Sequence, residues 1–384
     1  MASKAELPSE WVRKRLDAVG SVVTGSTPPT AVRAYYGHDK MFVSPADLGE
    51  TKYIGSTAKM LSLAGFARSR RIPAGATLFV CIGSTIGKVG LAADELATNQ
   101  QINAVIPNGQ VEEDFLYYAA CTLSARVRQR ASEQAVPLVN KTDFSAFEIP
   151  LPPKPEQRKI AGALNDADSA ITTLERLIAK KRDTKQGMAQ RLLTARSRLS
   201  GFSAPWQTRT LDELLSYEQP TPFLVRTTKQ LERGRVPVLT AGKTFVLGYT
   251  NENHGIYRAH PVIIFDDFTT ASKFVNFDFK AKSSAMKILS ARNGISPRFV
   301  YERMQLISVP LGEHKRHWIS EYRQLKIDVP EAKEQEAIAR VLQDAEAEIA
   351  VLSQKLTKMC DLRQGMLQVL LSGRIRLPAV EAAA

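Results

Sequence analysis

Three short stretches of the chain carry residue types that could do chemistry. The first, "GSTIGK" (residues 83–88), is a glycine-rich turn that ends in lysine, as phosphate-binding loops do. It departs from that pattern twice, because Ile82 stands where the first glycine belongs and Val89 where Ser or Thr would bind magnesium. We therefore interpret it as a tight turn between two strands, from which Lys88 could touch a DNA phosphate.

The second stretch, "FDDFTTASKFVNFDFK" (residues 265–280), offers the residue types of a metal-dependent nuclease. Such enzymes present carboxylates to magnesium and hold a lysine near the attacking water. Asp267 (or Asp266), Asp278 and Lys280 could supply that set. The competing interpretation is a hairpin with charged side chains on its solvated face. The nuclease hypothesis predicts magnesium-dependent cutting that Asp278→Ala abolishes.

The third stretch, "HKRH" (residues 314–317), places two histidines three positions apart, without a third metal ligand in sight. The three cysteines lie far apart, which argues against a disulfide framework and suits a reducing cytoplasm. No G-x-G-x-x-G fingerprint and no Asn/Asp-Pro-Pro-aromatic tetrapeptide is present. We therefore expect no metal ion and no catalytic residue in this chain.

Clusters of Arg and Lys suit nucleic acid better than any catalytic hypothesis. The net charge of +13 favours a polyanionic partner. Arg can bind guanine bidentately, whereas Lys more often anchors a phosphate. A solvated charged face is the alternative for any one cluster. The candidate DNA-contacting residues are Arg68, Arg70, Arg71, Lys88, Arg126, Arg128, Arg130, Lys273, Lys280, Lys282, Lys287 and Arg316.

These clusters are set in a frame that the chain writes twice. "QGMAQRLLTARSRL" (residues 186–199) returns as "QGMLQVLLSGRIRL" (residues 364–377). Extending the match back to Glu156 and Glu334 gives 20 identities in 44 positions without a gap. The repeated stretch has no nucleophile, paired carboxylates or metal ligands, which indicates framework. The match also reaches the start of each half, where Trp11, Leu16 and Asp17 correspond to Trp206, Leu211 and Asp212.

Both copies predict a long helix that needs a partner. Proline-rich segments, "IPLPPKPEQ" and "DVPEAKEQ", end the preceding region before each helix begins. Apolar residues then recur in steps of three and four, as in a heptad seam. A helix of about 38 residues would be about 57 Å long, so the two copies are expected to pack on each other. The predicted seam residues are Ile160, Leu164, Ile171, Leu174, Ile178, Met188, Leu192, Ile338, Leu342, Ile349, Leu352, Leu356, Met366 and Leu370.

Gly187 and Gly365 interrupt this pattern at the same register. Each costs roughly 1 kcal/mol relative to Ala inside a helix. Close approach of the two helices, or the end of their straight portion, would explain the repetition, and terminal fraying is the alternative.

The two regions between the repeated parts differ from each other. Strand-like runs such as "TLFVCIG", "KVGLAA" and "INAVIP" in the first, and "PVIIFDD" and "KFVNFDF" in the second, are separated by turns. Short helical stretches accompany them, so each region predicts an α+β domain of ordinary size. No apolar run is long enough to span a membrane, and the N-terminus has no apolar core of a signal peptide.

With this pattern the chain resembles the DNA-specificity (S) subunits of type I restriction-modification systems. The resemblance rests on "STIGKVGLAADELATNQQINAVIP" (residues 84–107), on the helix opening "EQRKIAGALNDADSAITTLE" after prolines, and on the twice-written helix end. It covers essentially the full length. It implies two target recognition domains, residues 1–155 and 200–333. An antiparallel coiled coil of the helices in 156–199 and 334–384 would separate them, in a pseudo-two-fold internal repeat.

The resemblance implies recognition without catalysis. Each domain would read one half of a bipartite site on double-stranded DNA. Two modification subunits, which bind S-adenosylmethionine and methylate adenine, would dock on the frame, and restriction subunits would join for cleavage. A spacer tens of ångströms long would hold the readers about one DNA turn, roughly 34–36 Å, apart. The alternatives are the nuclease and a structural scaffold that reads no DNA.

Overall fold

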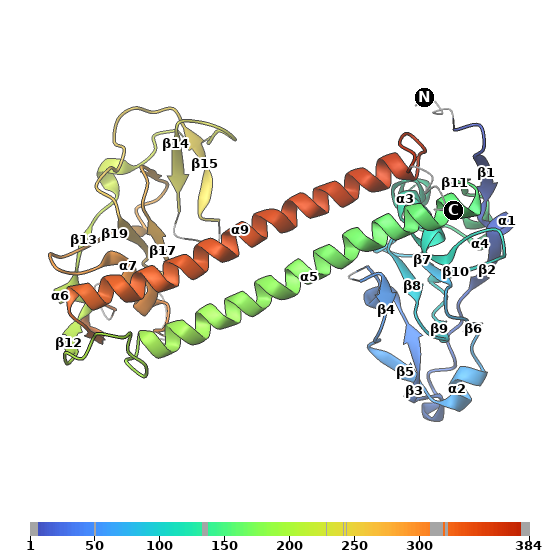
Figure 1. Ribbon diagram of the computed structural model, residues 1–384, viewed down its shortest axis with the longest axis horizontal. Helices are drawn as coiled ribbons and strands as arrows, with labels where there is room; N and C mark the ends of the chain where they lie inside the picture. Colours follow the sequence, from blue (N-terminus) through green and yellow to red (C-terminus); the bar gives the residue numbers. More distant parts are fainter. Residues whose placement is uncertain are drawn as a thin grey trace, which may run out of the picture. The chain divides into compact units, whose positions relative to one another are not determined.

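The computed structural model describes residues 7–49, 51–132, 137–227, 229–240, 242, 244–307, 318 and 322–377. Its internal contacts divide the chain into unit 1 (Met1–Leu174 and Lys355–Ala384) and unit 2 (Glu175–Gln354). Two long helices, α5 (Lys154–Leu192) and α9 (Ala332–Leu370), each contribute one part to unit 1 and one part to unit 2 (Figure 1). No helix in the described part of the chain is long and apolar enough to cross a membrane.

Unit 1 combines helices with three antiparallel or mixed sheets, as the strand-like runs predicted. A two-stranded sheet joins β1 (Val12–Arg15) to β11 (Glu148–Leu151). The main sheet has the order β2-β10-β7-β8-β4, with β2 at Gly20–Thr24, β10 at Ile102–Pro107, β7 at Thr77–Val80, β8 at Val89–Ala92 and β4 at Tyr53–Ile54. The second sheet has the order β5-β3-β9-β6, with β5 at Lys59–Leu61, β3 at Tyr36–Val43, β9 at Leu96–Thr98 and β6 at Arg71–Ile72.

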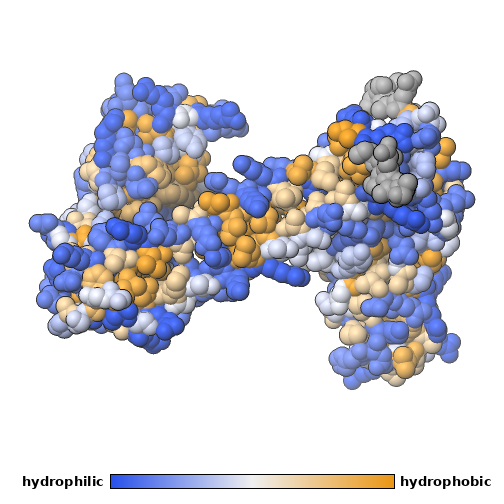
Figure 2. Space-filling model, in the orientation of Figure 1, coloured by the Kyte–Doolittle hydropathy of each residue, from blue (hydrophilic) through white to orange (hydrophobic). Residues whose placement is uncertain are grey.

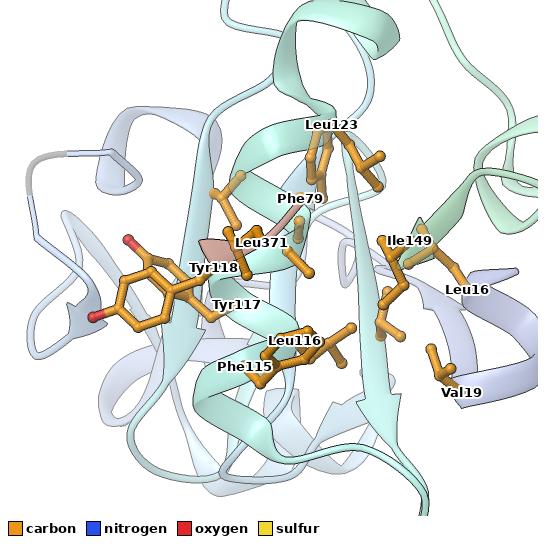
Figure 3. Packing of buried hydrophobic residues seen from close by; sticks show 14 of the residues in the cluster. Leu16, Val19, Phe79, Phe115, Leu116, Tyr117, Tyr118, Leu123, Ile149 and Leu371 are labelled. Atoms are coloured by element: carbon orange, nitrogen blue, oxygen red, sulfur yellow. The ribbon is translucent and has the colours of Figure 1, made fainter. Parts of the chain in front are cut away.

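The longest helix of unit 1 outside α5 and α9 packs on the main sheet, and a shorter helix lies beside the second sheet. The short helix α1 (Leu16–Val19) follows β1, and α2 (Leu63–Ala67) lies beside the second sheet. The longer α3 (Glu113–Ala131) packs on β7 and β8, and α4 (Lys141–Ser145) leads into β11. Figure 3 shows Phe115, Leu116 and Leu123 of α3 gathered with Phe79 of β7 and Leu371, so this core also includes the end of α9.

Unit 2 repeats this plan with shorter elements. β12 (Gln207–Thr210) pairs with β20 (Lys326–Val329), and α6 (Leu211–Leu214) and α7 (Pro297–Met304) are its helices outside α5 and α9 in the described residues. The main sheet has the order β13-β19-β16-β17, with β13 at Leu215–Glu218, β19 at Met286–Ala291, β16 at Val262–Asp266 and β17 at Ser272–Val275. The second sheet has the order β15-β14-β18, with β15 at Val246–Thr250, β14 at Val236–Leu239 and β18 at Lys280–Ala281.

Both long helices end in the same backbone conformation. Ala195 follows α5 with φ 57° and Gly373 follows α9 with φ 73°, both left-handed. The Ser197 amide then donates to the Arg191 carbonyl at 3.1 Å, and the Ile375 amide to the Val369 carbonyl at 3.2 Å. These six-residue bonds satisfy carbonyls that the helix end leaves open, as in a Schellman motif.

Candidate nucleic-acid interface

In unit 1 a buried carboxylate joins the start of the chain to α5 and to the segment after α9. The Trp11 indole Nε1 donates to Glu156 at 3.1 Å. The Arg376 guanidinium donates to both oxygens of Glu156, at 3.0 and 2.8 Å, and to Glu10 at 2.7 Å. Charge-assisted bidentate bonds of this kind fix geometry as well as contribute energy. The node therefore holds the first strand against the helical frame.

Unit 2 contains the same node at the corresponding positions. The Trp206 indole donates to Glu334 at 3.1 Å, and Arg198 donates to its two oxygens at 2.6 and 2.7 Å. Glu334 has no exposed surface. Glu156 and Glu334, like Arg198 and Arg376, lie 178 positions apart. The node of each unit thus takes its Glu from one copy of the repeat and its Arg from the other.

The apolar contacts of α5 and α9 follow the same rule. The N-terminal part of one helix meets the C-terminal part of the other in each core. In unit 1 the buried positions are Ile160, Ala161 and Leu164 with Leu367, Leu370 and Leu371. In unit 2 they are Ile338, Ala339 and Leu342 with Ala189, Leu192 and Leu193, and all six correspond at a spacing of 178.

A glutamine at the start of each long helix binds the residue just before an earlier helix of the same unit. Gln157 donates to the Pro152 carbonyl at 2.8 Å and accepts from the Glu112 amide, just before α3, at 2.9 Å. Gln335 donates to the Pro330 carbonyl at 2.8 Å, and its side-chain oxygen accepts from the Ser296 amide, just before α7, at 2.8 Å. In both units, therefore, the long helices hold the part that carries the sheets by the same glutamine contact.

A polar network in unit 1 joins α3 to both long helices. Figure 3 shows the hydroxyls of Tyr117 and Tyr118 pointing out of the apolar cluster. The Tyr118 hydroxyl lies 2.7 Å from both Asn165 and Asp168, and Arg363 of α9 pairs with Asp168. Burial, together with the Asp168 carboxylate, raises the pKa of Tyr118, so the phenol keeps its proton and donates.

Lys52 and Asp114 extend this network. Lys52 is 2.6 Å from Asp114 and 2.5 Å from Asn165. Burial acts to raise the pKa of Asp114, but the hydrogen bonds from Lys52 and Asn165 and the Lys52 charge outweigh it, so the pKa falls below its usual value.

The corresponding junction of unit 2 uses the same frame charges with different partners. Glu346 and Lys185 stand 178 positions from Asp168 and Arg363. Arg298 of α7 pairs with Glu346 and also with Glu302, and Lys185 lies 3.6 Å from Glu302. In both units one long helix supplies an acid and the other a base. In unit 1 the Tyr118 phenol of α3 contacts the acid, and in unit 2 the Arg298–Glu302 ion pair of α7 contacts both.

Residues that are identical in both copies and exposed (half-buried at Gly187) form a second, outward face. Lys180, Asp183, Gly187 and Gln190 follow one another in steps of three, four and three, so they share one side of α5. It lies opposite the buried positions of the same helix. The same face recurs on α9 at Lys358, Asp361, Gly365 and Gln368, all exposed. We name these two sets the outward stripes.

The structure decides against one explanation of the repeated glycines. A Cβ added to Gly187 or Gly365 would meet no atom within 4 Å, so close approach of the two helices does not account for them. Both helices also continue beyond them, to Leu192 and Leu370. All fourteen predicted seam residues are buried or half-buried. The packing of Ile171, Leu174, Ile178, Ile349, Leu352 and Leu356 against the other helix stays a prediction.

In unit 1 the predicted DNA-contacting cations lie on two different layers. Arg68, Arg70 and Arg71 are exposed at the end of α2 and on β6, beside the second sheet. Arg70 also donates to the Thr24 carbonyl at 2.8 Å, and Arg71 stacks over the Phe66 ring. These arginines therefore lie beside the second sheet, and contacts within unit 1 position the side chains of Arg70 and Arg71.

The other predicted cations of unit 1 lie near α3. Arg126, Arg128 and Arg130 are exposed on its C-terminal half. Arg126 and Arg128 line a cavity of about 720 Å³. Lys88 is half-buried and donates to the Pro45 carbonyl at 3.4 Å, at the end of the predicted turn between β7 and β8. The glycines of that turn have left-handed φ angles of 96° and 93°, as a tight turn requires.

In unit 2 the structure removes two lysines from the candidate set. Lys280 has no exposed surface and pairs with Glu252 at 2.7 Å. Lys287 is 2% exposed, 3.5 Å from Asp267 and hydrogen-bonded to Gln219. A buried ammonium group committed to a carboxylate cannot reach a phosphate. Lys273 and Lys282 are half-buried, and Arg316, like His314 and His317, lies outside the described residues.

The proposed nuclease residues do not gather into a metal site. Asp267 is buried and its carboxylate also accepts the Trp318 amide, while Asp278 pairs with Arg258 and His260. The described residues contain no group of three or more His, Cys, Asp or Glu side chains that could hold a metal ion. The competing hairpin exists as β16 and β17, but Asp267, which follows β16, is buried and paired with Lys287 rather than solvated.

Sequence reasoning left out other exposed cations, and five of them bear on the second sheets. Arg33 precedes β3 of unit 1. In unit 2, Arg226, Lys229, Arg233 and Arg235 lie between β13 and β14. The available signal was regional charge, since residues 26–71 hold seven Lys and Arg against three acids and residues 219–258 hold six against two. In both units the excess thus falls on the part that builds the second sheet.

Part of this sequence is similar to known proteins. Residues 8–181 match the family model described as the type I restriction modification DNA specificity domain. A type I restriction enzyme specificity subunit of Escherichia coli is 51% identical over 138 residues, which cover 34% of each chain. One from Methanocaldococcus jannaschii is 30% identical over 171 residues, covering 43% of this chain and 40% of the relative. The chain thus spans about a third to two fifths of the length of these curated relatives.

The fold extends the likeness to the whole chain. The crystal structure of a type I restriction-modification S subunit from M. genitalium superposes with a TM-score of 0.66, covering 97% of this chain and 99% of that one at 16% identity. Residues 8–181 are therefore similar to type I restriction-modification DNA specificity domains, and the chain as a whole shares the fold of a solved type I S subunit.

Proposed function

We propose that this chain reads a bipartite site on double-stranded DNA, one half with each unit, and itself catalyses nothing. One observation carries the proposal: the same frame contacts occur twice, at positions 178 apart, and hold two recognition parts whose second sheets and exposed cations differ. A DNA site with two different halves requires two different recognition surfaces, and the repeated helices hold one in each unit. The matched specificity domain supports this assignment.

The proposal includes a spacer. α5 and α9 would form an antiparallel coiled coil, because in unit 1 Asp168 pairs with Arg363 and in unit 2 Lys181 pairs with Glu348 at 2.7 Å, so rising numbers on one helix meet falling numbers on the other. The readers would then keep a set separation, and bases between the half-sites would go unread. Inserting one heptad into each helix adds about 10 Å and should lengthen the gap by about three base pairs.

The outward stripes support two identical partners. Identity between the buried positions follows from shared packing, but exposed identity needs an outside contact made twice. We assign the stripes to two modification subunits, which would carry S-adenosylmethionine and methylate adenine, with restriction subunits joining for cleavage. The DNA-contacting candidates that remain are Arg68, Arg70, Arg71, Lys88, Arg126, Arg128, Arg130, Lys273 and Lys282.

The test is selection from a pool of random duplexes by the full chain expressed with its modification subunits. The proposal predicts enrichment of two short motifs separated by a gap of constant length and variable sequence. Enrichment of one continuous motif, or of none, would contradict it. Magnesium-dependent cutting by the chain alone would favour the nuclease, and the absence of salt-dependent binding would favour the scaffold.

A further inference from the structure

One segment of unit 2 carries four exposed cations that form no ion pair with a described carboxylate. Arg226, Lys229, Arg233 and Arg235 are all exposed, and Glu232 is the one acidic residue between them in the sequence. Among the described residues, none of these four side chains lies within ion-pair distance of a carboxylate. We name this segment, residues 226–227 and 229–235, the crest. Figure 2 shows hydrophilic residues gathered over the end of unit 2 that carries β14 and β15.

Hydrogen bonds to β15 and to the residues after it hold the crest in place. In its middle, Leu231 and Tyr249 exchange two backbone bonds of 2.9 and 2.8 Å. At its C-terminal end, the Arg235 amide donates to the Asn251 side chain at 3.1 Å. The crest is thus ordered along its backbone, while its charged side chains face solvent.

The N-terminal end of the crest depends on one carboxylate. Glu252 accepts the amides of Arg226 and Thr227, at 3.0 and 3.2 Å. The same carboxylate pairs with Lys280 at 2.7 Å, and the Lys280 ammonium group also donates to the His254 carbonyl at 2.8 Å. Lys280 is fully buried, so Glu252 cannot leave without stranding a buried charge.

Two energetically unfavourable features therefore occur together in this part of unit 2. The fold buries Lys280, and it places four exposed cations within nine described residues that include one acid, Glu232. A solvated charged face needs neither, because mobile side chains and counter-ions would relax the repulsion. Exposed cations on a backbone that hydrogen bonds hold at both ends and in the middle are suited to a polyanion such as the phosphates of a duplex.

We propose that the crest is the surface by which unit 2 binds the DNA sugar-phosphate backbone, and that Glu252, held by Lys280, is the positioning residue that orders it. This inference rests on the proposed function and goes beyond it by naming the contact surface. The crest sets register on the duplex; base reading falls to other side chains of the unit.

The first experiment removes the crest charges. A variant with Arg226, Lys229, Arg233 and Arg235 all changed to Gln is compared with a matched control that loses four exposed cations of the unit 2 helices, Arg176, Arg182, Lys333 and Arg340, also to Gln. Binding to the selected duplex is followed by fluorescence anisotropy from 50 to 200 mM salt. The crest variant should bind at least tenfold more weakly, with a log–log salt slope smaller by about 3, and the control should stay near wild type.

The second experiment distinguishes the positioning role of Glu252 from its charge, because the two predict opposite changes in DNA affinity. Glu252→Gln makes the chain more positive, so bulk electrostatics alone predicts tighter DNA binding. Loss of crest order predicts weaker binding, together with faster hydrogen exchange at the Arg226 and Thr227 amides. The double variant Glu252→Gln/Lys280→Met keeps the net charge and an amide acceptor and removes the stranded lysine, so it should recover most of the affinity and protection.

The outcomes distinguish the inference from the function. Equal losses in the crest variant and its control, or tighter binding by Glu252→Gln, overturn the crest alone while sequence-selective binding by the wild-type chain persists. A wild-type chain that selects no sequence overturns the proposed function and the crest with it.

Discussion

Unit 1 and unit 2 hold their recognition parts by the same contacts and present different surfaces. The Glu and Arg of the node, the anchoring glutamine and the six core positions recur 178 residues apart, in α5 and α9 and the residues just after them, and each Glu binds a Trp at the start of its half. The second sheets differ, with four strands and α2 in unit 1 and three strands with the crest in unit 2. The frame is thus preserved where the chain must hold itself and its partners, and the surface diverges where each half meets something different.

The junctions show how divergence is accommodated. Each offers one frame acid and one frame base, Asp168 with Arg363 or Glu346 with Lys185. Unit 1 meets them with Tyr118, and unit 2 meets them with the Arg298–Glu302 pair. Both solutions satisfy the buried or half-buried charges, so the reader can change without redesign of the frame.

Breaking the node should have the largest effect on stability, and should do so unequally. Glu334→Ala leaves Arg198 and the Trp206 indole without their shared acceptor inside unit 2, so it should lower the free energy of unfolding of that unit most. Glu156→Ala should cost less, because the Arg376 side chain is 44% exposed and can turn to water. Hydrogen exchange resolved by peptide should show the loss confined to the unit that carries each substitution. Equal losses in the two units would contradict the difference in burial.

Reversing one outward stripe should remove one partner and leave the other. Lys180→Glu/Asp183→Lys keeps the net charge and alters unit 2 alone, so the complex should bind one modification subunit in place of two. Native mass spectrometry measures that ratio. A control reversal at Glu175 and Arg182, which are exposed but not repeated in α9, should leave two subunits bound. A ratio unchanged in the stripe variant would refute the docking assignment.

Acid should loosen unit 1 through Asp114. Its pKa is lower in the folded chain than the unfolded value of about 3.9, so protonation favours unfolding. Its contribution is complete above that value and is lost as pH falls through the folded pKa. Amide protection in α3 should therefore decline below about pH 4. Asp114→Asn should flatten that decline, and an identical pH profile in the variant would exclude this carboxylate as its source.

The smallest effect should come from the helix ends. Ala195 occupies a left-handed position that its counterpart fills with Gly373. Ala195→Gly relieves that strain and should stabilise unit 2 by about 0.5–1 kcal/mol. Chemical denaturation of the full chain should register the gain. A loss of stability would mean that the entropy of the unfolded glycine outweighs the strain at this end.

Sequence reasoning succeeded where the spacing of apolar residues indicates which side chains are buried. The steps of three and four located both long helices, and the strand-like runs located β7, β8 and β10, because apolar side chains at those intervals must face a core. It failed where a side chain's partner is distant in sequence. Lys280 and Lys287 look like surface cations until Glu252 and Asp267 are seen beside them.

The crest was missed for the same reason. Its cations are spread among Thr, Gln, Leu and Gly, so no local cluster marks them. Their order depends on Tyr249, Asn251 and Glu252, which come from the next hairpin. Local sequence therefore identifies the frame better than the surfaces that the frame presents.

The most direct test of the account is to exchange residues 12–151 for the corresponding part of a specificity subunit with a different site and to map methylated adenines in DNA exposed to the complex. The account predicts that one half of the recognised sequence changes while the other half and the gap are retained. A change in both halves, or in neither, would contradict independent reading by the two units.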